Sequence, residues 1–163
     1  PWHQDNGLWR DGDIEPFNWW MALDPATKEN GCLQFIPSSH KTEIVHHVLY
    51  EDSLHGELPH ERVEEMIDTY GVVHVELEPG SIVCWHSNAW HYSPPNSSEY
   101  GRIAIAGVYS TPEIVQKRVR RDHDYRWIMK NGQVPSDFPS KPYKVPNPDK
   151  NWKPKPWTKV GEK

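Results

Sequence analysis

A histidine and a carboxylate stand two positions apart at the start of the chain, as His3 and Asp5 in the run PWHQD. On an extended chain, residues i and i+2 project to the same side, so this imidazole and carboxylate could face one metal ion together. One more histidine would complete a 2-His-1-carboxylate facial triad, the arrangement that leaves positions open on a non-haem iron. The His-x-Asp pattern alone is a weak signal, because it arises by chance in many proteins.

Two later histidines share the same local sequence in the run CWHSNAWHYS, where a tryptophan precedes both His86 and His91. Their five-residue spacing fits neither a helix face nor a strand face, so we expect the two rings to point different ways. Arg102 stands eleven residues after His91, at the start of the next predicted strand. A guanidinium there can bind a carboxylate bidentately, with the Ser93 hydroxyl beside it. The pattern therefore predicts a metal ion with a dicarboxylate bound next to it.

Most other histidines lie in polar, loop-like or helix-edge sequence, which favours solvated side chains. This group comprises His46, His47, His55, His60 and His123. We therefore assign them no role in the predicted site.

Short elements joined by turns must position these residues. Runs rich in β-branched and aromatic residues predict strands at 17–23, 32–37, 72–78, 81–85 and 102–110. Apolar residues at helical spacing (Val63, Met66, Ile67 and Tyr70) predict an amphipathic helix at 60–70. A capping-box-like start favours a further helix in 111–131. Several short strands with turns between them are typical of a small barrel or jelly roll rather than of βαβ units.

Length and charge indicate one domain with a distinct C-terminal end. The chain has 163 residues; segment 1–111 holds 5 Lys/Arg against 17 Asp/Glu, and segment 112–163 holds 13 against 6. We divide it into a core at 1–111 and a helical, Pro/Lys-rich extension at 112–163, packed on the core or trailing from it. The acidic core argues against nucleic-acid binding, because a protein needs Lys and Arg to neutralise the phosphates.

The sequence also bears on compartment. It contains neither a membrane-spanning apolar run nor a signal peptide. Cys32 and Cys84 are isolated, and we favour two buried free thiols over a disulfide, which fits a cytoplasmic protein with no membrane partner.

The motifs in combination resemble the phytanoyl-CoA dioxygenase family of Fe(II)/2-oxoglutarate-dependent oxygenases. The runs PWHQD, WWMAL, ENGCLQFIPSSHK, PGSIVCWHSNAWHYSPPNSS and GRIAIAGVYS follow the family's order. The resemblance covers about residues 1–110, and the C-terminal third carries no motif of the family. It implies a mainly β, cupin-like double-stranded β-helix (jelly roll) with a few short helices and the metal at its mouth.

The resemblance also implies site residues. The iron ligands would be His3, Asp5 and His91. The 2-oxoglutarate-binding residues would be Arg102, Ser93, Gln4 and Trp20. His91 is chosen over His86 because it alone keeps the family's interval to the arginine, and we expect it in the loop after the strand predicted at 81–85. His86, at the end of that strand, is expected to be structural or to support the ligands without binding the metal.

Two departures from the family pattern carry expectations. Family members have roughly a hundred residues before the His-x-Asp motif, so we expect a natural form with an upstream segment. The usual Pro-Gly-Ser-His run reads Pro37-Ser38-Ser39-His40 here, so Ser38 must adopt the turn. The carboxylate of Asp5 is retained, whereas related halogenases replace it with a small residue. Hydroxylation is therefore the better prediction.

The implied reaction consumes O₂ and 2-oxoglutarate, hydroxylates a small molecule and releases succinate and CO₂. A CoA thioester would suit the basic C-terminal segment, and a small polar metabolite remains an alternative substrate. Two rival hypotheses stay open. One is a metal-binding cupin-like module or incomplete oxygenase fragment without turnover, and the other is a purely structural jelly roll. The sequence does not predict an oligomeric state.

Overall fold

The computed structural model describes residues 1–9, 17–51, 53, 55–109 and 131–134. Its helical elements are α1 (Asp5–Trp9), the 3-10 turn η1 (Ser39–Lys41) and α2 (His60–Tyr70). Its strands are β1 (Phe17–Ala22), β2 (Leu33–Phe35), β3 (Val73–Val75), β4 (Ile82–His86), β5 (His91–Tyr92) and β6 (Ala104–Tyr109). The predicted strands and the 60–70 helix are confirmed, although most strands are shorter than predicted. The helix predicted at 111–131 and the 112–163 extension lie, apart from 131–134, outside these residues.

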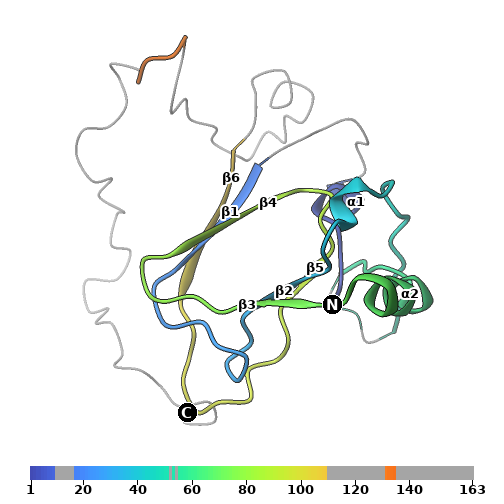
Figure 1. Cartoon of the computed structure of the whole chain (residues 1–163), viewed down its shortest axis with the longest axis horizontal. Coiled ribbons are helices and arrows are strands. Elements are labelled where there is room, and N and C mark those ends of the chain that lie inside the picture. The colour runs from blue at the N-terminus through green and yellow to red at the C-terminus, as the bar shows by residue number, and fades with distance from the viewer. Residues whose placement is uncertain (10–16, 52, 54, 110–130, 135–163) are drawn as a thin grey trace.

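The described strands form two antiparallel sheets of three, ordered β4-β1-β6 and β3-β2-β5. In Figure 1 the β4-β1-β6 sheet lies above the other, with α1 and α2 grouped at one side. Aromatic rings from the two sheets meet between them, since Phe35 of β2 and Trp85 of β4 pack edge to face with centroids 5.5 Å apart. Two facing antiparallel sheets are the arrangement of a jelly roll. The predicted fold class is therefore confirmed.

The central strand β1 sorts its side chains by alternation. Asn18 is paired with Trp85 of β4, and the next residue on that face is Trp20. Because Trp85 packs on Phe35 of the opposite sheet, this face is the inner one. Phe17 points the other way and is 47% exposed, so the outer face of this sheet is apolar and open over the described residues.

A compact apolar cluster lies beside the second sheet. Ile36, Leu58, Val63 and Trp90 form its buried centre. Helix α2 contributes Val63 and packs Met66 and Ile67 against it, as its apolar spacing predicts. Tyr70 was expected on the same face but, as the last residue of the helix, is 49% exposed. The cluster contains Ile36, which follows β2, and Trp90, which precedes β5, so it holds one end of each of these paired strands.

The turn after β2 adopts the conformation that the missing glycine demands. Ser38 has φ 62°, in the left-handed region that a glycine enters more easily. The next residue, Ser39, is fully buried; its hydroxyl donates to the Ile36 carbonyl (2.6 Å) and accepts the Trp90 N–H (2.9 Å). The expectation for Ser38 is confirmed, and Ser39 ties the turn to the segment that precedes His91.

Two sequence expectations need correction. The cysteines are free, as predicted, but only Cys32 is buried; Cys84 is exposed on the outer face of β4. His91 was expected in a loop, yet it begins β5, because its backbone pairs with Phe35 of β2.

No helix in the described part of the chain is long and apolar enough to cross a membrane.

Candidate metal centre

Two histidines are brought together by backbone pairing. His3 and His91 form an isolated antiparallel bridge, with each N–H donating to the other's carbonyl at 3.1 Å. Directly opposed residues in such a pair bring their side chains close. The two imidazole rings accordingly lie with centroids 4.1 Å apart. This backbone bridge thus joins two of the predicted ligands, His3 and His91, which are 88 residues apart in the sequence.

Both imidazoles are oriented by their Nδ1 atoms. Nδ1 of His3 lies 3.0 Å from the Pro1 carbonyl, and Nδ1 of His91 lies 2.9 Å from the Ala89 carbonyl. A carbonyl only accepts, so each ring presents an N–H at Nδ1, and the neutral form of each ring has its lone pair on Nε2. A backbone carbonyl that fixes the tautomer in this way is typical of metal-binding histidines.

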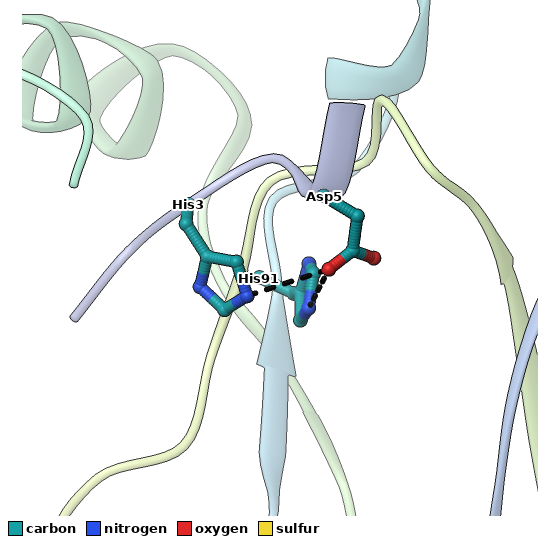
Figure 2. A group of neighbouring side chains, drawn as sticks. All are labelled: His3, Asp5 and His91. Carbon is teal, nitrogen blue, oxygen red and sulfur yellow. Dashed lines mark ion pairs between the residues drawn. The ribbon is translucent and has the colours of Figure 1, made fainter. Parts of the chain in front are cut away.

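The free nitrogens converge on one carboxylate oxygen. Nε2 of His3 and Nε2 of His91 lie 3.6 and 3.8 Å from Oδ1 of Asp5 (Figure 2). One ligand atom from each of the three residues lies within 4.8 Å of the other two, so His3, Asp5 and His91 could hold a metal ion. The structure therefore brings together the three predicted ligands. Asp5 is the first residue of α1 rather than part of an extended run, so the convergence depends on this turn.

The other carboxylate oxygen is anchored by the β4-β1-β6 sheet. Oδ2 of Asp5 accepts hydrogen bonds from Asn18 Nδ2 (2.9 Å) and Trp85 Nε1 (3.1 Å), both on the inner face. Asn18 also donates to the Ser87 hydroxyl at 2.7 Å. With Oδ2 held by two donors, Oδ1 is the oxygen left to face the histidines. Sequence reasoning missed Asn18, because an asparagine within a strand has no motif of its own.

Burial and neighbouring polar groups together set the pKa values of Asp5 and His91. Burial by itself raises the pKa of Asp5, but the hydrogen bond to His3, the charges of His91 and His3, and the Trp85 donor outweigh it, so the pKa lies below its ordinary value. Burial lowers the pKa of His91 to about 4, although Asp5 acts in the opposite direction. An anionic carboxylate and a neutral imidazole are the forms that bind a metal.

Further aromatic rings surround the three residues. The ring of His91 stacks on Phe35 with centroids 5.6 Å apart, and Trp85 lies 5.1 Å away. The ring of His55 meets His3 edge to face at 5.0 Å. His55 was expected to be solvated, and this expectation is wrong, because the 48–57 hairpin carries it onto the N-terminal segment. His91 is left 4% exposed.

A second group gathers around Arg102. Its guanidinium donates to the Ser93 hydroxyl (3.0 Å) and to the Gly31 carbonyl, and lies over the Trp20 ring at 5.0 Å from the centroid. Ser93 donates to the same Gly31 carbonyl at 2.8 Å. Burial lowers the pKa of Arg102, a sign that its charge is partly withdrawn from water. Three of the four residues predicted for the cosubstrate are therefore neighbours.

The two groups lie along one strand face. Asn18, which holds Asp5, and Trp20, which underlies Arg102, are consecutive residues on the inner face of β1. Two residues along a strand span about 7 Å.

Glycine at position 31 permits the arrangement around Arg102. Gly31 has φ +83°, and a Cβ there would lie 2.4 Å from the Pro94 carbonyl oxygen. Either feature excludes an ordinary side chain. The run KENG signals only a turn, so the role of this glycine was not predicted.

Gln4, the fourth predicted cosubstrate residue, is fully buried, and its side chain hydrogen-bonds to backbone groups. Its amide nitrogen donates to the carbonyls of Glu43 (3.2 Å) and Asn88 (3.0 Å), and its oxygen accepts the Val45 N–H (2.8 Å). Its assignment to the cosubstrate stays a prediction, while its observed contacts join three segments around the metal candidates.

His86 belongs to a different face from His91. It pairs with Phe17 on the outer side of the sheet, and its Nδ1 accepts the Asn88 N–H at 3.0 Å. Its nearest described ring partner is His40, with centroids 6.1 Å apart. These contacts organise the turn between β4 and β5.

Two histidines and a carboxylate that could hold a metal ion thus converge in a jelly roll, and mononuclear non-haem metal proteins use this set of ligands. The family profile "Phytanoyl-CoA dioxygenase (PhyH)" matches residues 1–104. The chain belongs to the phytanoyl-CoA dioxygenase family.

Relatives and solved structures agree with this membership. A phytanoyl-CoA dioxygenase domain-containing protein 1 homolog from Caenorhabditis briggsae is 30% identical over 78% of this chain and 41% of its own length. An L-proline trans-4-hydroxylase from Streptomyces griseoviridis is 30% identical over 68% of this chain and 47% of its own. The crystal structure of EctD from S. alaskensis with 2-oxoglutarate and 5-hydroxyectoine has a TM-score of 0.60 and 26% identity, over 69% of this chain and 38% of that one. The chain thus spans less than half the length of these proteins.

Proposed function

We propose that this chain forms the core of an Fe(II)- and 2-oxoglutarate-dependent hydroxylase, with His3, Asp5 and His91 as the iron ligands. The observation that carries the proposal is the convergence of two imidazole Nε2 atoms on one carboxylate oxygen. Two imidazoles and a carboxylate suit non-haem iron, and the chemistry of this donor set fits the metal. An EctD structure with bound Fe, 25% identical with a TM-score of 0.55, supports iron as the metal.

The cosubstrate site is proposed at Arg102 and Ser93. A guanidinium half withdrawn from water is the group best suited to hold the distal carboxylate of 2-oxoglutarate, and the Ser93 hydroxyl beside it supplies a further donor. Trp20 provides the wall beneath the guanidinium. Gln4 is retained as a prediction for the near end of the same pocket, next to the ligands.

The protein's own part in the reaction is to bind, orient and exclude water. Iron, when bound, supplies the activation of O₂ that no side chain can perform. Asn18 and Trp85 keep Oδ2 of Asp5 occupied, so the carboxylate presents Oδ1. Phe35 and Trp85 shield His91 from water. These groups hold the ligands in place before any substrate arrives, which lowers the cost of reaching the reactive arrangement.

Asp5 favours hydroxylation as the outcome. Its carboxylate oxygen fills the third protein position, at the place where the related halogenases lack a carboxylate. The products would be the hydroxylated substrate, succinate and CO₂. Both substrate classes predicted from the sequence, a CoA thioester and a small polar metabolite, are retained, because similar proteins have names of both kinds.

The test is an anaerobic titration followed by turnover. Adding Fe(II) and 2-oxoglutarate should produce the weak visible absorption of the iron–2-oxoglutarate chelate, and a panel of substrates should then be screened for succinate formation in air. Absorption with succinate supports the hydroxylase. Absorption without succinate from any substrate would favour the metal-binding module without turnover, and no absorption would contradict the metal site itself.

A further inference from the structure

The backbone amide between two of the proposed ligands is held by a third histidine. The Gln4 N–H donates to Nε2 of His47 at 2.9 Å. Nδ1 of His47 lies 2.9 Å from the Val45 carbonyl, so the ring carries its proton there and offers a lone pair at Nε2. Burial lowers the pKa of His47, which favours this neutral form. The expectation that His47 is solvated is therefore wrong.

A glycine makes room for this ring. A Cβ added at Gly7 of α1 would lie 2.0 Å from Cε1 and 2.2 Å from Nδ1 of His47. Atoms cannot approach so closely, so any side chain at position 7 would displace the imidazole. The first helix and the histidine are thus fitted to each other, and the Gln4 contact depends on both.

The contact is reciprocal. While His47 binds the Gln4 backbone, the Gln4 side chain binds the segment that leads to His47, through the Glu43 carbonyl and the Val45 N–H. The same side chain reaches the Asn88 carbonyl, three residues before His91. Segments carrying all three proposed ligands are therefore joined at Gln4.

Backbone hydrogen bonds hold the hairpin that begins next to His47. Val48 and Glu57 exchange two backbone hydrogen bonds of 2.8 Å, and the Leu58 N–H donates to the Trp2 carbonyl at 2.9 Å. His55 of the same hairpin packs its ring against His3. Residues 43–48 and 55–58 therefore contact the N-terminal segment 2–5, and His47 accepts the backbone N–H of Gln4.

We propose that His47 is a positioning residue for the metal centre, which sets the turn between His3 and Asp5 by accepting the Gln4 amide. This inference rests on the proposed function, because it concerns the geometry of that same site. His47 does not touch the metal; it acts through the backbone that carries two of the ligands. The requirement for glycine at position 7 follows from it.

The experiment measures Co(II) binding to the metal-free protein, using the visible absorption of Co(II) as a probe of ligand geometry. His47→Ala should weaken Co(II) binding about 10–100-fold, the range for residues that orient metal ligands, and should change the absorption bands. His46→Ala, at the exposed neighbouring position, is the matched control and should leave both unchanged. Circular dichroism and thermal unfolding establish that each variant is folded.

Conservative variants separate positioning from packing. In His47→Gln an amide oxygen can reach the place of Nε2 and should restore the wild-type bands, whereas the shorter His47→Asn should not. Restored bands in His47→Gln support the proposal. Wild-type bands and affinity in both His47→Ala and His47→Asn would overturn it.

Gly7→Ala tests the same hydrogen bond without touching His47. It should reproduce the weakened binding in the wild-type background and have little further effect in the His47→Ala background, because the clashing ring is then absent. Additive losses would overturn the proposal. Should His47→Ala fail to fold, Gly7→Ala in the wild-type background decides the matter, and unchanged Co(II) affinity and absorption bands in that variant would overturn the proposal. Absence of Co(II) binding by the wild type would instead contradict the proposed function, so the two failures are distinguishable.

Discussion

Asn18 donates from its side-chain amide to Oδ2 of Asp5 at 2.9 Å, and this contact leaves Oδ1 as the oxygen that faces both histidines. The donor comes from the central strand of one sheet, while the acceptor opens the first helix. The orientation of the carboxylate is therefore determined by the sheet rather than by the short His-x-Asp motif.

Replacement of Asn18 by alanine should loosen the metal centre. We expect Fe(II) or Co(II) binding to weaken about 10–100-fold, since Trp85 remains as a second donor to Asp5. Asn30→Ala is the control, because among the described residues the hydrogen bonds of that amide lie within the turn at 25–30. Metal titration with a parallel thermal melt is the measurement, and equal losses in both variants would argue against a specific role for Asn18.

Removal of the Arg102 guanidinium should weaken 2-oxoglutarate binding and leave metal binding intact. Arg102→Ala should weaken 2-oxoglutarate binding by about 2–5 kcal/mol, because a buried carboxylate loses its partner, while Co(II) affinity stays within twofold or so of the wild type. Arg102→Lys should recover little, since an ammonium cannot form the paired contacts. Calorimetric titration of 2-oxoglutarate decides this, and unchanged affinity in Arg102→Ala would remove the assignment.

Glycine substitutions at the two neighbouring serines in the turn after β2 should change the free energy of unfolding in opposite directions. Ser38→Gly should raise the free energy of unfolding by up to about 1 kcal/mol, because the left-handed backbone strain is relieved. Ser39→Gly should lower it by about 1–3 kcal/mol, because the Trp90 amide loses its buried acceptor. Urea denaturation of both variants provides the comparison; a loss on Ser38→Gly would contradict the strain argument.

The two cysteines should differ strongly in reactivity. Burial raises the pKa of Cys32, which is fully shielded from solvent, so little reactive thiolate forms at pH 8. Cys84 is exposed. A chromogenic disulfide reagent should therefore titrate one thiol quickly in the native protein and the second only after unfolding. Rapid reaction of both, or a loss of rapid reaction in Cys32→Ser but not Cys84→Ser, would contradict the assignment.

The sequence predicted the structural features that have a recognisable sequence pattern. The 60–70 helix followed from its apolar spacing, and the turn at Ser38 followed from the absent glycine. The three proposed ligands followed from their intervals and from the family resemblance. The helix and the turn each depend on a few neighbouring residues, so they can be recognised without knowing what the chain packs against. The ligands were recognised through motifs that the resemblance supplied.

Contacts between distant segments were not predictable. His47 and His55 were assigned to solvent because their neighbours are polar, yet the hairpin brings both onto the N-terminal segment. Asn18 and Gly31 had no motif, since the partner of each lies far along the chain. These residues hold the site in place, and only the three-dimensional arrangement shows which ones they are.

The central claim is that His91, and not His86, completes the metal site with His3 and Asp5. The structure places His91 opposite His3 and places His86 on the outer face of its sheet. The direct test is anaerobic titration of His91→Ala and His86→Ala with Fe(II) and 2-oxoglutarate, read by the visible absorption of the chelate. His91→Ala should lose the absorption and the succinate formed with it, while His86→Ala should keep both with an affinity within about tenfold of the wild type. Loss of the absorption in His86→Ala, with its retention in His91→Ala, would contradict the account.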